Sequence, residues 1–349
     1  MKIEQHTIGY RDNKEVKLFN LTNQSGLSIA ITNYGGTITS IKAPDKHGKF
    51  EEITLGFDDP AAYWSEKYLA NCPYFGCVIG RVGNRIAKGK FVLNGQNYTL
   101  AINNGENHLH GGLKAFDKVV WDAEASEDQT GAKVSMTYTS PDMEEGYPGN
   151  LAVKFSYTLT DANELIIDYE AETDKATPVN LTNHTYFNLS GCKRNILDHD
   201  LQILSNRITE INDALIPTGK IVNIKQTDFN FNELRPIGER IEKVPGGYDN
   251  NYVLDNEQGE LICAALVIDP ESGRTLEVFT TEPGVQLYTG NFLDGSYSRG
   301  GFSFTKHTAF CLETQHYPDS VNHREFPSII LEEDEIYTQT TIYKFGVEE

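Results

Sequence analysis

The stretch LAVKFSYTL, residues 151–159, decides the fold class of this chain. Apolar or aromatic residues at its odd-numbered positions alternate with small or polar residues at the even-numbered ones. This period of two is typical of a half-buried strand, because successive side chains of a strand point to opposite faces of a sheet. The turn sequence DAN at 161–163 and a second strand-like run at 164–172 follow. The segment therefore predicts an antiparallel hairpin.

The same pattern continues on both sides of this hairpin. Residues 133–138 alternate in the same way, NG at 94–95 separates the runs 90–93 and 96–100, and SG at 272–273 separates 266–268 from 275–280. Amphipathic helices are scarce, with short helical turns expected near 60–68 and 233–243. No internal repeat or linker interrupts the chain. We therefore predict an all-β protein, a large antiparallel β-sandwich formed by one domain of residues 1–349. The acidic run at 332–335 is expected to be a solvated turn between two C-terminal strands.

Composition narrows the class of ligand. The 349 residues include 30 Lys and Arg against 50 Asp and Glu, a formal net charge of −20. So acidic a surface repels nucleic acid, anionic membranes and, more weakly, phosphorylated substrates. A neutral small molecule is the expected partner. The start of the chain has no apolar signal core, no segment is apolar enough to cross a membrane, and the five cysteines suggest no disulfide framework. We therefore expect a cytoplasmic protein with reduced thiols.

Three polar patches combine titratable residues with glycines and aromatics: GRVGNRI at 80–86 with NHLHGG at 107–112, NLTNHTYFN at 180–188, and CLETQHYPD at 311–319. The first could be a tight turn with solvated arginines, and it lacks the flanking elements of a phosphate-binding loop. His108 and His110 alternate on a predicted strand and should point the same way. They are either paired zinc ligands or one functional and one incidental histidine.

His184 and Glu313 are the strongest candidates for chemistry. Each lies in a strand-like run of apolar and aromatic residues, where an unpaired charge is costly. His184 could still be a core histidine bound to nearby carbonyls. Three asparagines around it, Asn180, Asn183 and Asn188, favour recognition of a polyhydroxylated ligand such as a sugar.

At these segments the sequence closely resembles the aldose 1-epimerase (galactose mutarotase) family. The motifs are NRI at 84–86, LHGG at 109–112, NLTNHTYFNL at 180–189, PGVQ at 283–286 and LETQ at 312–315. The resemblance runs from residue 33 to residue 320, in the shared order of the family. It implies the large antiparallel β-sandwich of the mutarotases, with a sugar in an open cleft.

The resemblance also implies roles for individual residues. The glutamate of LETQ, Glu313, would be the general base, the histidine of TNH, His184, the general acid, and His110 would support the ring-oxygen side of the sugar. The substrate-binding residues would be Asn84, Arg85, Asp249 and Gln286. One departure is that Asn250 follows Asp249 where the family usually has histidine. Mutarotation involves no redox step, so neither a cofactor nor a metal is implied.

Other functions remain open at the level of sequence. Asp249 and Glu313 could be the carboxylate pair of a glycosidase, and His108, His110 and His184 could bind zinc in a hydrolase. The chain could also be a hexose-6-phosphate epimerase or a non-catalytic sugar-binding protein. The expected ligand is a free sugar such as galactose or glucose, bound by a monomer or a homodimer.

Overall fold

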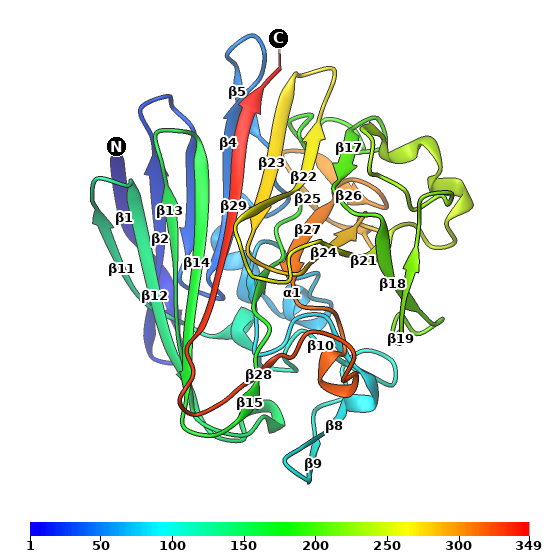
Figure 1. Cartoon of the computed structure of the whole chain (residues 1–349). Helices are drawn as coiled ribbons and strands as arrows, with labels where there is room; N and C mark the ends of the chain where they lie inside the picture. The colour runs from blue at the N-terminus through cyan, green and yellow to red at the C-terminus, as the bar shows by residue number, and fades with distance from the viewer. Residues whose placement is uncertain (349) are drawn as a thin grey trace.

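Antiparallel pairing builds the three large sheets of the computed structural model, which describes residues 1–348 (Figure 1). The first sheet has the order β1-β2-β3-β4-β5: β1 (Lys2–Arg11), β2 (Lys14–Thr22), β3 (Ser28–Thr32), β4 (Thr37–Pro44) and β5 (Phe50–Glu52). The second has nine strands in the order β11-β12-β13-β14-β29-β23-β22-β17-β20: β11 (Asp122–Glu127), β12 (Ala132–Ser140), β13 (Leu151–Leu159), β14 (Glu164–Thr173), β29 (Tyr337–Val347), β23 (Arg274–Thr280), β22 (Ile262–Ile268), β17 (Asp200–Ile203) and β20 (Arg235–Pro236). The third has the order β19-β18-β21-β24-β27: β19 (Pro217–Asn223), β18 (Arg207–Ile211), β21 (Asp249–Val253), β24 (Gly284–Tyr288) and β27 (Cys311–Gln315).

Short two-stranded ladders and helical turns connect these sheets. The ladders are β6 (Val78–Ile79) with β16 (Thr182–Asn183), β7 (Arg85–Ile86) with β10 (His108–Leu109), β8 (Lys90–Leu93) with β9 (Gln96–Thr99), β15 (Thr177–Pro178) with β28 (Ile330–Leu331), and β25 (Asp294–Arg299) with β26 (Phe302–Thr305). The helical segments are α1 (Glu66–Ala70) and the 3-10 turns η1 (Pro60–Trp64), η2 (Ala87–Gly89), η3 (Phe116–Lys118), η4 (Glu144–Gly146), η5 (Ile237–Glu239), η6 (Ile241–Lys243) and η7 (Ser320–Asn322).

The predicted elements are confirmed where the sequence pattern was clear. The hairpin of residues 151–172 is β13 and β14, and the NG and SG turns join β8 to β9 and β22 to β23. Both expected helical regions contain short helices, α1 with η1 and η5 with η6. The acidic run at 332–335 is exposed between β28 and β29. Among residues 1–348, the longest apolar helix falls far short of the length needed to cross a membrane.

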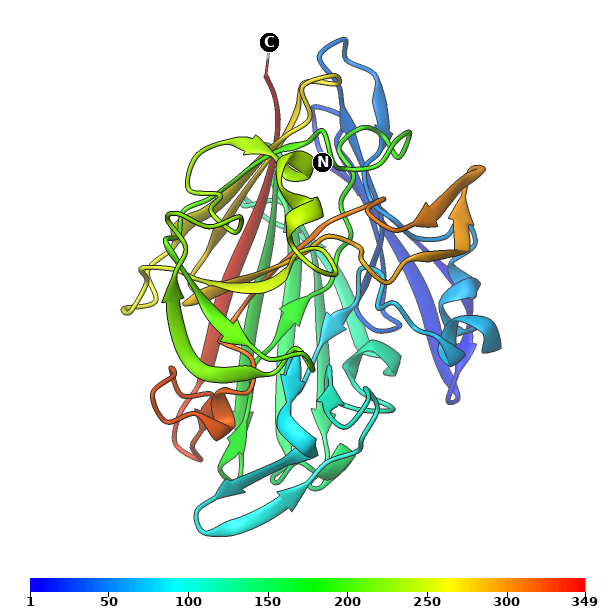
Figure 2. The ribbon, with the colours of Figure 1, turned by 90° about the vertical axis from the view of Figure 1, so that its right-hand side faces the viewer.

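The main hydrophobic core joins all three large sheets. It contains Phe19 of β2, Tyr157 of β13 and Leu287 of β24, all 0% exposed. In the turned view of Figure 2, the first sheet and the third sheet lie at opposite sides of the long strands of the nine-stranded sheet. Hydrogen bonds from Thr314 to Thr341 and from Tyr343 to the Leu312 carbonyl hold β27 against β29. The third sheet is therefore fixed in place, and its other face is free to carry a site.

Candidate active site

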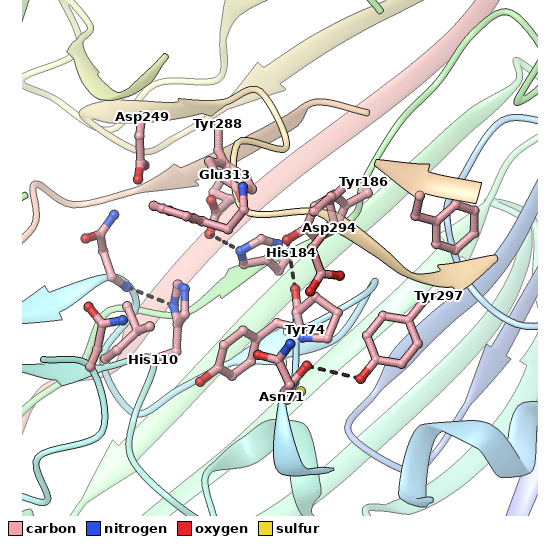
Figure 3. Close-up of a pocket in the computed structure, with 18 of the residues that line it drawn as sticks. Asn71, Tyr74, His110, His184, Tyr186, Asp249, Tyr288, Asp294, Tyr297 and Glu313 are labelled. Atoms are coloured by element: carbon pink, nitrogen blue, oxygen red, sulfur yellow. Dashed lines mark hydrogen bonds and ion pairs between the residues drawn. The ribbon is translucent and has the colours of Figure 1, made fainter. Parts of the chain in front are cut away.

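A pocket of about 910 Å³, counted with its open mouth, lies against the third sheet (Figure 3). Its lining comes from segments far apart in the sequence, including residues 71–74, 84–85, 104, 109–110, 292–294 and 297. Six of the seven predicted site residues line it: Asn84, Arg85, His110, His184, Asp249 and Glu313. The fold therefore brings the predicted polar patches together in one cavity.

Two adjacent strand pairings place the acidic residues of the pocket. In the register of β21, β24 and β27, Asn251 pairs with Gln286 and Gln286 pairs with Glu313. Because side chains alternate along a strand, Asp249, Gln286 and Glu313 face the same side of the sheet. Glu313 is 2% exposed and its Oε2 atom has no hydrogen-bond partner. The sheet thus presents an unpaired buried carboxyl group to the pocket.

Gln286 is placed behind Asp249 rather than in the lining of the pocket. Its Nε2 atom donates a hydrogen bond of 2.6 Å to Asp249 Oδ1. Asn250 alternates with Asp249 and so faces the opposite side of β21, where it is buried. The departure from the family pattern at Asn250 therefore lies behind the sheet.

The His184 ring is held between two tyrosines. The Tyr186 ring lies 5.0 Å away at 23° and the Tyr74 ring lies 6.0 Å away at 27°, measured between ring centroids and planes. The backbone of His184 is fixed by bonds to Cys77 and Gly76. Its Nε2 atom lies 3.8 Å from Glu313 Oε2, which is longer than a hydrogen bond. The two groups face each other without a hydrogen bond between them, so each is free to bond an oxygen of a bound ligand.

His110 is held in an unusual backbone conformation beside Asn84. Both residues lie in the left-handed region, with φ of 49° and 56°, and strained backbone of this kind persists only where the surroundings enforce it. His110 N–H donates to the Asn84 carbonyl, and Asn84 N–H donates to His110 Nδ1 at 3.2 Å. A neutral imidazole whose Nδ1 accepts a hydrogen bond carries its proton on Nε2. His110 is therefore a donor toward the pocket.

Burial moves the pKa values of the two facing groups in opposite directions. Burial, together with the negative charge of Asp249, raises the pKa of Glu313 well above its ordinary value, and Arg85 opposes that rise. Burial lowers the pKa of His184 to about 4. Burial also raises the pKa of Asp249. With these opposite shifts, a proton shared by the pair is held by the carboxyl group, while the imidazole is neutral.

The structure corrects the expected alternation of the two neighbouring histidines. Only His108 lies in the short strand β10, and the left-handed backbone at His110 breaks the period of two. His108 is 0% exposed; its Nδ1 donates to the Ala101 carbonyl and its Nε2 accepts from the Tyr147 hydroxyl. His108 is thus the incidental core histidine of the pair. The zinc site of His108, His110 and His184 is not formed.

A different group of three residues could reach a common ion, but its chemistry is unfavourable. Ligand atoms of His110, His184 and Glu313 lie within 4.8 Å of one another. Metal binding through His110 Nε2 would require the proton to move to Nδ1 and would break the bond from Asn84 N–H. The donor set therefore does not fit a resident metal.

We accordingly expect turnover to be insensitive to chelators. Protein dialysed against EDTA should keep its full activity, and added zinc should give no increase in kcat. Metal analysis of the dialysed sample is the control. A loss of activity that stoichiometric zinc restores would contradict the hydrogen-bond assignment at His110.

Two other expectations from sequence are wrong. The arginines of residues 80–86 are not solvated: Arg81 is 2% exposed and donates to the carbonyls of residues 140, 141, 148 and 149. The three asparagines near His184 do not recognise a ligand, because they are buried and bind the protein itself. Asn180 binds the His316 backbone, Asn183 the Gly76 carbonyl, and Asn188 the Thr308 carbonyl. They hold the loop that carries His184.

Sequence reasoning missed the aromatic wall of the pocket. Tyr74, Tyr288, Phe292 and Tyr297 line it, and Asp294 lies beside them (Figure 3). Tyr74 has a φ of 62° and its ring packs 4.7 Å from the His110 ring. These residues come from loops, from the end of β24 and from the short strand β25, with no distinctive spacing, so no periodic signal identifies them. Apolar ring faces beside polar groups suit the two faces of a sugar.

Comparison with known proteins shows the family of this chain. Residues 17–344 match the family described as aldose 1-epimerase. The chain is 45% identical to galactose mutarotase from Bos taurus over 324 residues, 92% of each chain, and 33% identical to aldose 1-epimerase from Escherichia coli over 344 residues, 97% of each chain. The crystal structure of galactose 1-epimerase from Lactobacillus acidophilus superimposes with a TM-score of 0.86 at 28% identity, covering 100% of this chain and 99% of that one. The likeness to this structure extends over the whole chain.

Proposed function

Since this chain belongs to the aldose 1-epimerase family, we propose that Glu313 and His184 open and close the ring of a free aldose. The enzyme interconverts the α and β anomers of its sugar. The observation that carries the assignment of roles is the unpartnered Oε2 atom of Glu313, 3.8 Å from His184 Nε2 in the pocket. Galactose and glucose are the proposed substrates, by analogy with the relatives named galactose mutarotase.

Each proton transfer has a matching group. The Glu313 carboxylate takes the proton of the C1 hydroxyl, the O1 electron pair forms the C1=O bond, and the C1–O5 bond breaks. The pair's single proton has first moved from Glu313 to His184, and O5 takes a proton from Nε2 of this doubly protonated ring, which leaves the ring neutral with its proton on Nδ1. After rotation about C1–C2, the reverse transfers close the ring on the other face of the aldehyde. His110 Nε2–H donates a hydrogen bond on the ring-oxygen side.

The electrostatics of the pocket assist ring opening. Opening requires the proton to leave His184 and another proton to arrive on Glu313, and burial favours both changes. The state with a neutral imidazole and a protonated carboxyl group accompanies the open-chain aldehyde. The pocket therefore favours the uncharged state of the His184–Glu313 pair, which accompanies the less stable, open form of the sugar.

The distant hydroxyls are proposed to bind Asn84, Arg85 and Asp249, with Gln286 holding Asp249 in place. Arg85 is fixed by a bond of 3.1 Å from its Nε to Asn104 Oδ1. It is the one cationic side chain among the described residues that line the pocket. A single cation in a lining that also has the three carboxyl groups of Asp249, Asp294 and Glu313 favours a neutral sugar over a sugar phosphate. This argues against the hexose-6-phosphate alternative.

The pH dependence of kcat/KM should be bell-shaped. Below about pH 4 both His184 and Glu313 are protonated. No base remains to take the C1 hydroxyl proton, so activity falls on the acid side. On the alkaline side activity falls as the pair loses its last proton, through the raised pKa of Glu313. Polarimetry corrected for spontaneous mutarotation checks this. Activity that keeps rising through the alkaline range would mean that the reaction does not need the pair's proton, which would contradict His184 as the acid.

Polarimetry of freshly dissolved α-D-galactose and α-D-glucose tests the function itself. Faster approach to an unchanged final rotation supports the proposal, and the ratio of the two rates gives the preference. A glycoside of the same sugar should not be hydrolysed. Acceleration of neither sugar would reject the proposed substrates, and glycoside hydrolysis would instead favour Asp249 and Glu313 as a glycosidase pair.

We further propose that the chain acts as one domain in the cytoplasm. The pocket draws on residues from 71 to 313, so no smaller part of the chain carries the whole site. All five cysteines lie among the described residues and none forms a disulfide, as suits a reducing compartment.

A further inference from the structure

The turn that follows the strand of the proposed base contacts the segment that carries a proposed sugar-binding residue. Glu313 lies on β27, and Asp319 lies in the turn between the end of that strand and η7. The Asp319 N–H donates to the Arg85 carbonyl at 3.0 Å, and Asp319 Oδ1 accepts from the Ala87 N–H at 3.0 Å. Asp319 thus binds the backbone on both sides of Ile86 and leaves the Arg85 side chain free for the pocket.

We propose that Asp319 is a positioning residue for Arg85: it fixes the backbone that carries the guanidinium group relative to the strand that carries Glu313. This role rests on the proposed binding of sugar hydroxyls by Arg85. Asp319 does not line the pocket. Because it acts through two backbone hydrogen bonds, its effect should fall on sugar binding and not on proton transfer.

The Arg85 side chain depends on its backbone for its place in the pocket. Arg85 is 7% exposed, and its Nε and Nη1 atoms donate to the side-chain oxygens of Asn104 and Asn84 at 3.1 and 3.5 Å. These amide oxygens are neutral, so they orient the guanidinium group and leave its charge for a ligand. Asn84 precedes Arg85 with a φ of 56°, and such a backbone persists only where its surroundings hold it.

The segment is held from two directions. On one edge β7 pairs with β10, with Arg85 opposite Leu109, and the Asn84 carbonyl accepts from the His110 N–H. The next carbonyl, that of Arg85, accepts from the Asp319 N–H. Successive carbonyls of an extended chain point to opposite edges, so β10 cannot supply this second bond. Asp319 therefore provides the hold on the edge that β10 leaves open.

Asp319 is itself held in place, as an anchor must be. It is 2% exposed, its Oδ1 also accepts from Asn322 Nδ2 at 2.6 Å, and its Oδ2 lies 3.5 Å from His323 Nε2. Asn322 Nδ2 donates in addition to the Lys90 carbonyl at 3.0 Å. A buried carboxyl group is costly unless it is hydrogen-bonded, and part of its bonding here comes from the segment that it holds. The turn at η7 and the chain from Arg85 to Lys90 therefore form one unit.

Binding of a sugar analogue that cannot react tests this role on the full-length protein. An analogue of galactose with hydrogen in place of the C1 hydroxyl keeps the distant hydroxyls but cannot open its ring. Its Kd is measured by NMR titration, without turnover. In Asp319→Ala we expect this Kd and the KM for galactose to rise about tenfold, as for one lost hydrogen bond. The kcat value should stay within about twofold.

Three further variants sharpen the test. Asp319→Asn keeps the Oδ1 acceptor for the Ala87 N–H and should recover most of the affinity. Asn322→Ala changes an exposed side chain that holds Asp319, and it should raise the Kd about twofold. Asp142→Ala is the matched control, because Asp142 also accepts from a backbone N–H, that of Gly149 at 2.6 Å, outside the pocket lining. Its Kd and KM should not change.

A double-mutant cycle with Arg85→Ala separates positioning from a general loss of stability. If Asp319 acts through Arg85, Asp319→Ala should raise the Kd far less when Arg85 is already alanine. A role confined to stability would lower the melting temperature without this coupling. Additive effects on the Kd, a fall in kcat at unchanged Kd, or equal losses in the alanine and asparagine variants would overturn the inference. Where Asp319→Ala does not fold, an unchanged Kd in Asn322→Ala overturns it.

Failure of this role and failure of the proposed function give different results. Wild-type protein that binds the analogue but does not accelerate mutarotation would reject the proposed chemistry, while the Kd values still decide the role of Asp319. Wild-type protein that does not bind the analogue would remove Arg85 from sugar binding and overturn the inference.

Discussion

Glu313→Gln is expected to lower kcat by roughly 10²–10⁴-fold, the range that general acid–base catalysis supplies, and to leave KM within a few-fold. The amide has the shape of the carboxyl group but cannot take the C1 hydroxyl proton. Its contacts in the ground state remain, so the loss falls on the chemical step. Initial rates of mutarotation by polarimetry, at saturating and at low sugar concentration, separate the two parameters. Near-normal turnover would remove Glu313 from the mechanism.

The same substitution should stabilise the empty protein at alkaline pH. The pKa of Glu313 is raised in the folded state relative to its value of 4.5, so the folded protein retains a proton that the unfolded chain releases. Its contribution to stability therefore falls as pH rises from about 4.5 toward the folded-state pKa. Glutamine does not titrate. The melting temperature of the variant should exceed that of the wild type at about pH 8, and the difference should shrink at about pH 4.5.

Glu282→Gln provides the matched control. Glu282 is also 2% exposed, but it pairs with His316 at 2.5 Å and does not line the pocket. Burial alone would lower the pKa of His316, and the Glu282 carboxylate raises it above its ordinary value. Loss of that carboxylate should lower the melting temperature and leave kcat unchanged. The two buried glutamates are thus expected to give opposite results for both stability and activity, and matching results would contradict the assignment.

The sheet architecture was predictable because each strand carries its own signal. Alternation in residues 151–159 identifies a strand, and the following turn fixes its partner, so the hairpin needs no distant information. The approach of β27 to the end of β16 has no such local signature. It depends on packing across the core, as in the bond between Thr314 and Thr341. The sequence therefore predicts where the strands lie in the chain. It does not predict which strands pack together to bring their polar residues into one site.

The candidate site was predictable in part for a related reason. A charge inside an apolar run, as at Glu313 and His184, is a visible conflict between local sequence and burial. A cluster of asparagines like the one around His184 would also suit a sugar-binding loop. Here the side-chain amides of Asn183 and Asn188 donate to backbone carbonyls of the protein itself. Whether such an asparagine binds a ligand or the backbone depends on the three-dimensional fold, which the local sequence does not specify. Tyr74 enters the pocket through a left-handed backbone that no pattern specifies.

His184→Asn is expected to reduce kcat by roughly 10²–10⁴-fold. The KM value should change by at most a small factor. Asparagine retains a donor near the position of the imidazole but cannot exchange a proton with O5 at accessible pH. It also loses the stacking on Tyr74 and Tyr186, so a modest drop in melting temperature should accompany the loss of activity. Kinetics by polarimetry and anomeric-proton NMR on the same sample measure both. A change confined to KM would instead make His184 a binding residue.

His199→Asn separates catalysis from the general effect of removing a buried histidine. Burial lowers the pKa of His199 to about 4, as it does for His184. His199 is 0% exposed, its Nε2 accepts from the Leu189 N–H, and it lies outside the pocket lining. Its substitution should cost stability while kcat is kept. Two histidines with the same lowered pKa would then differ a hundredfold or more in their effect on turnover. Asp269 lies near His199, so the difference would follow from the position of His184 and Glu313 in the pocket and not from a neighbouring carboxyl group alone.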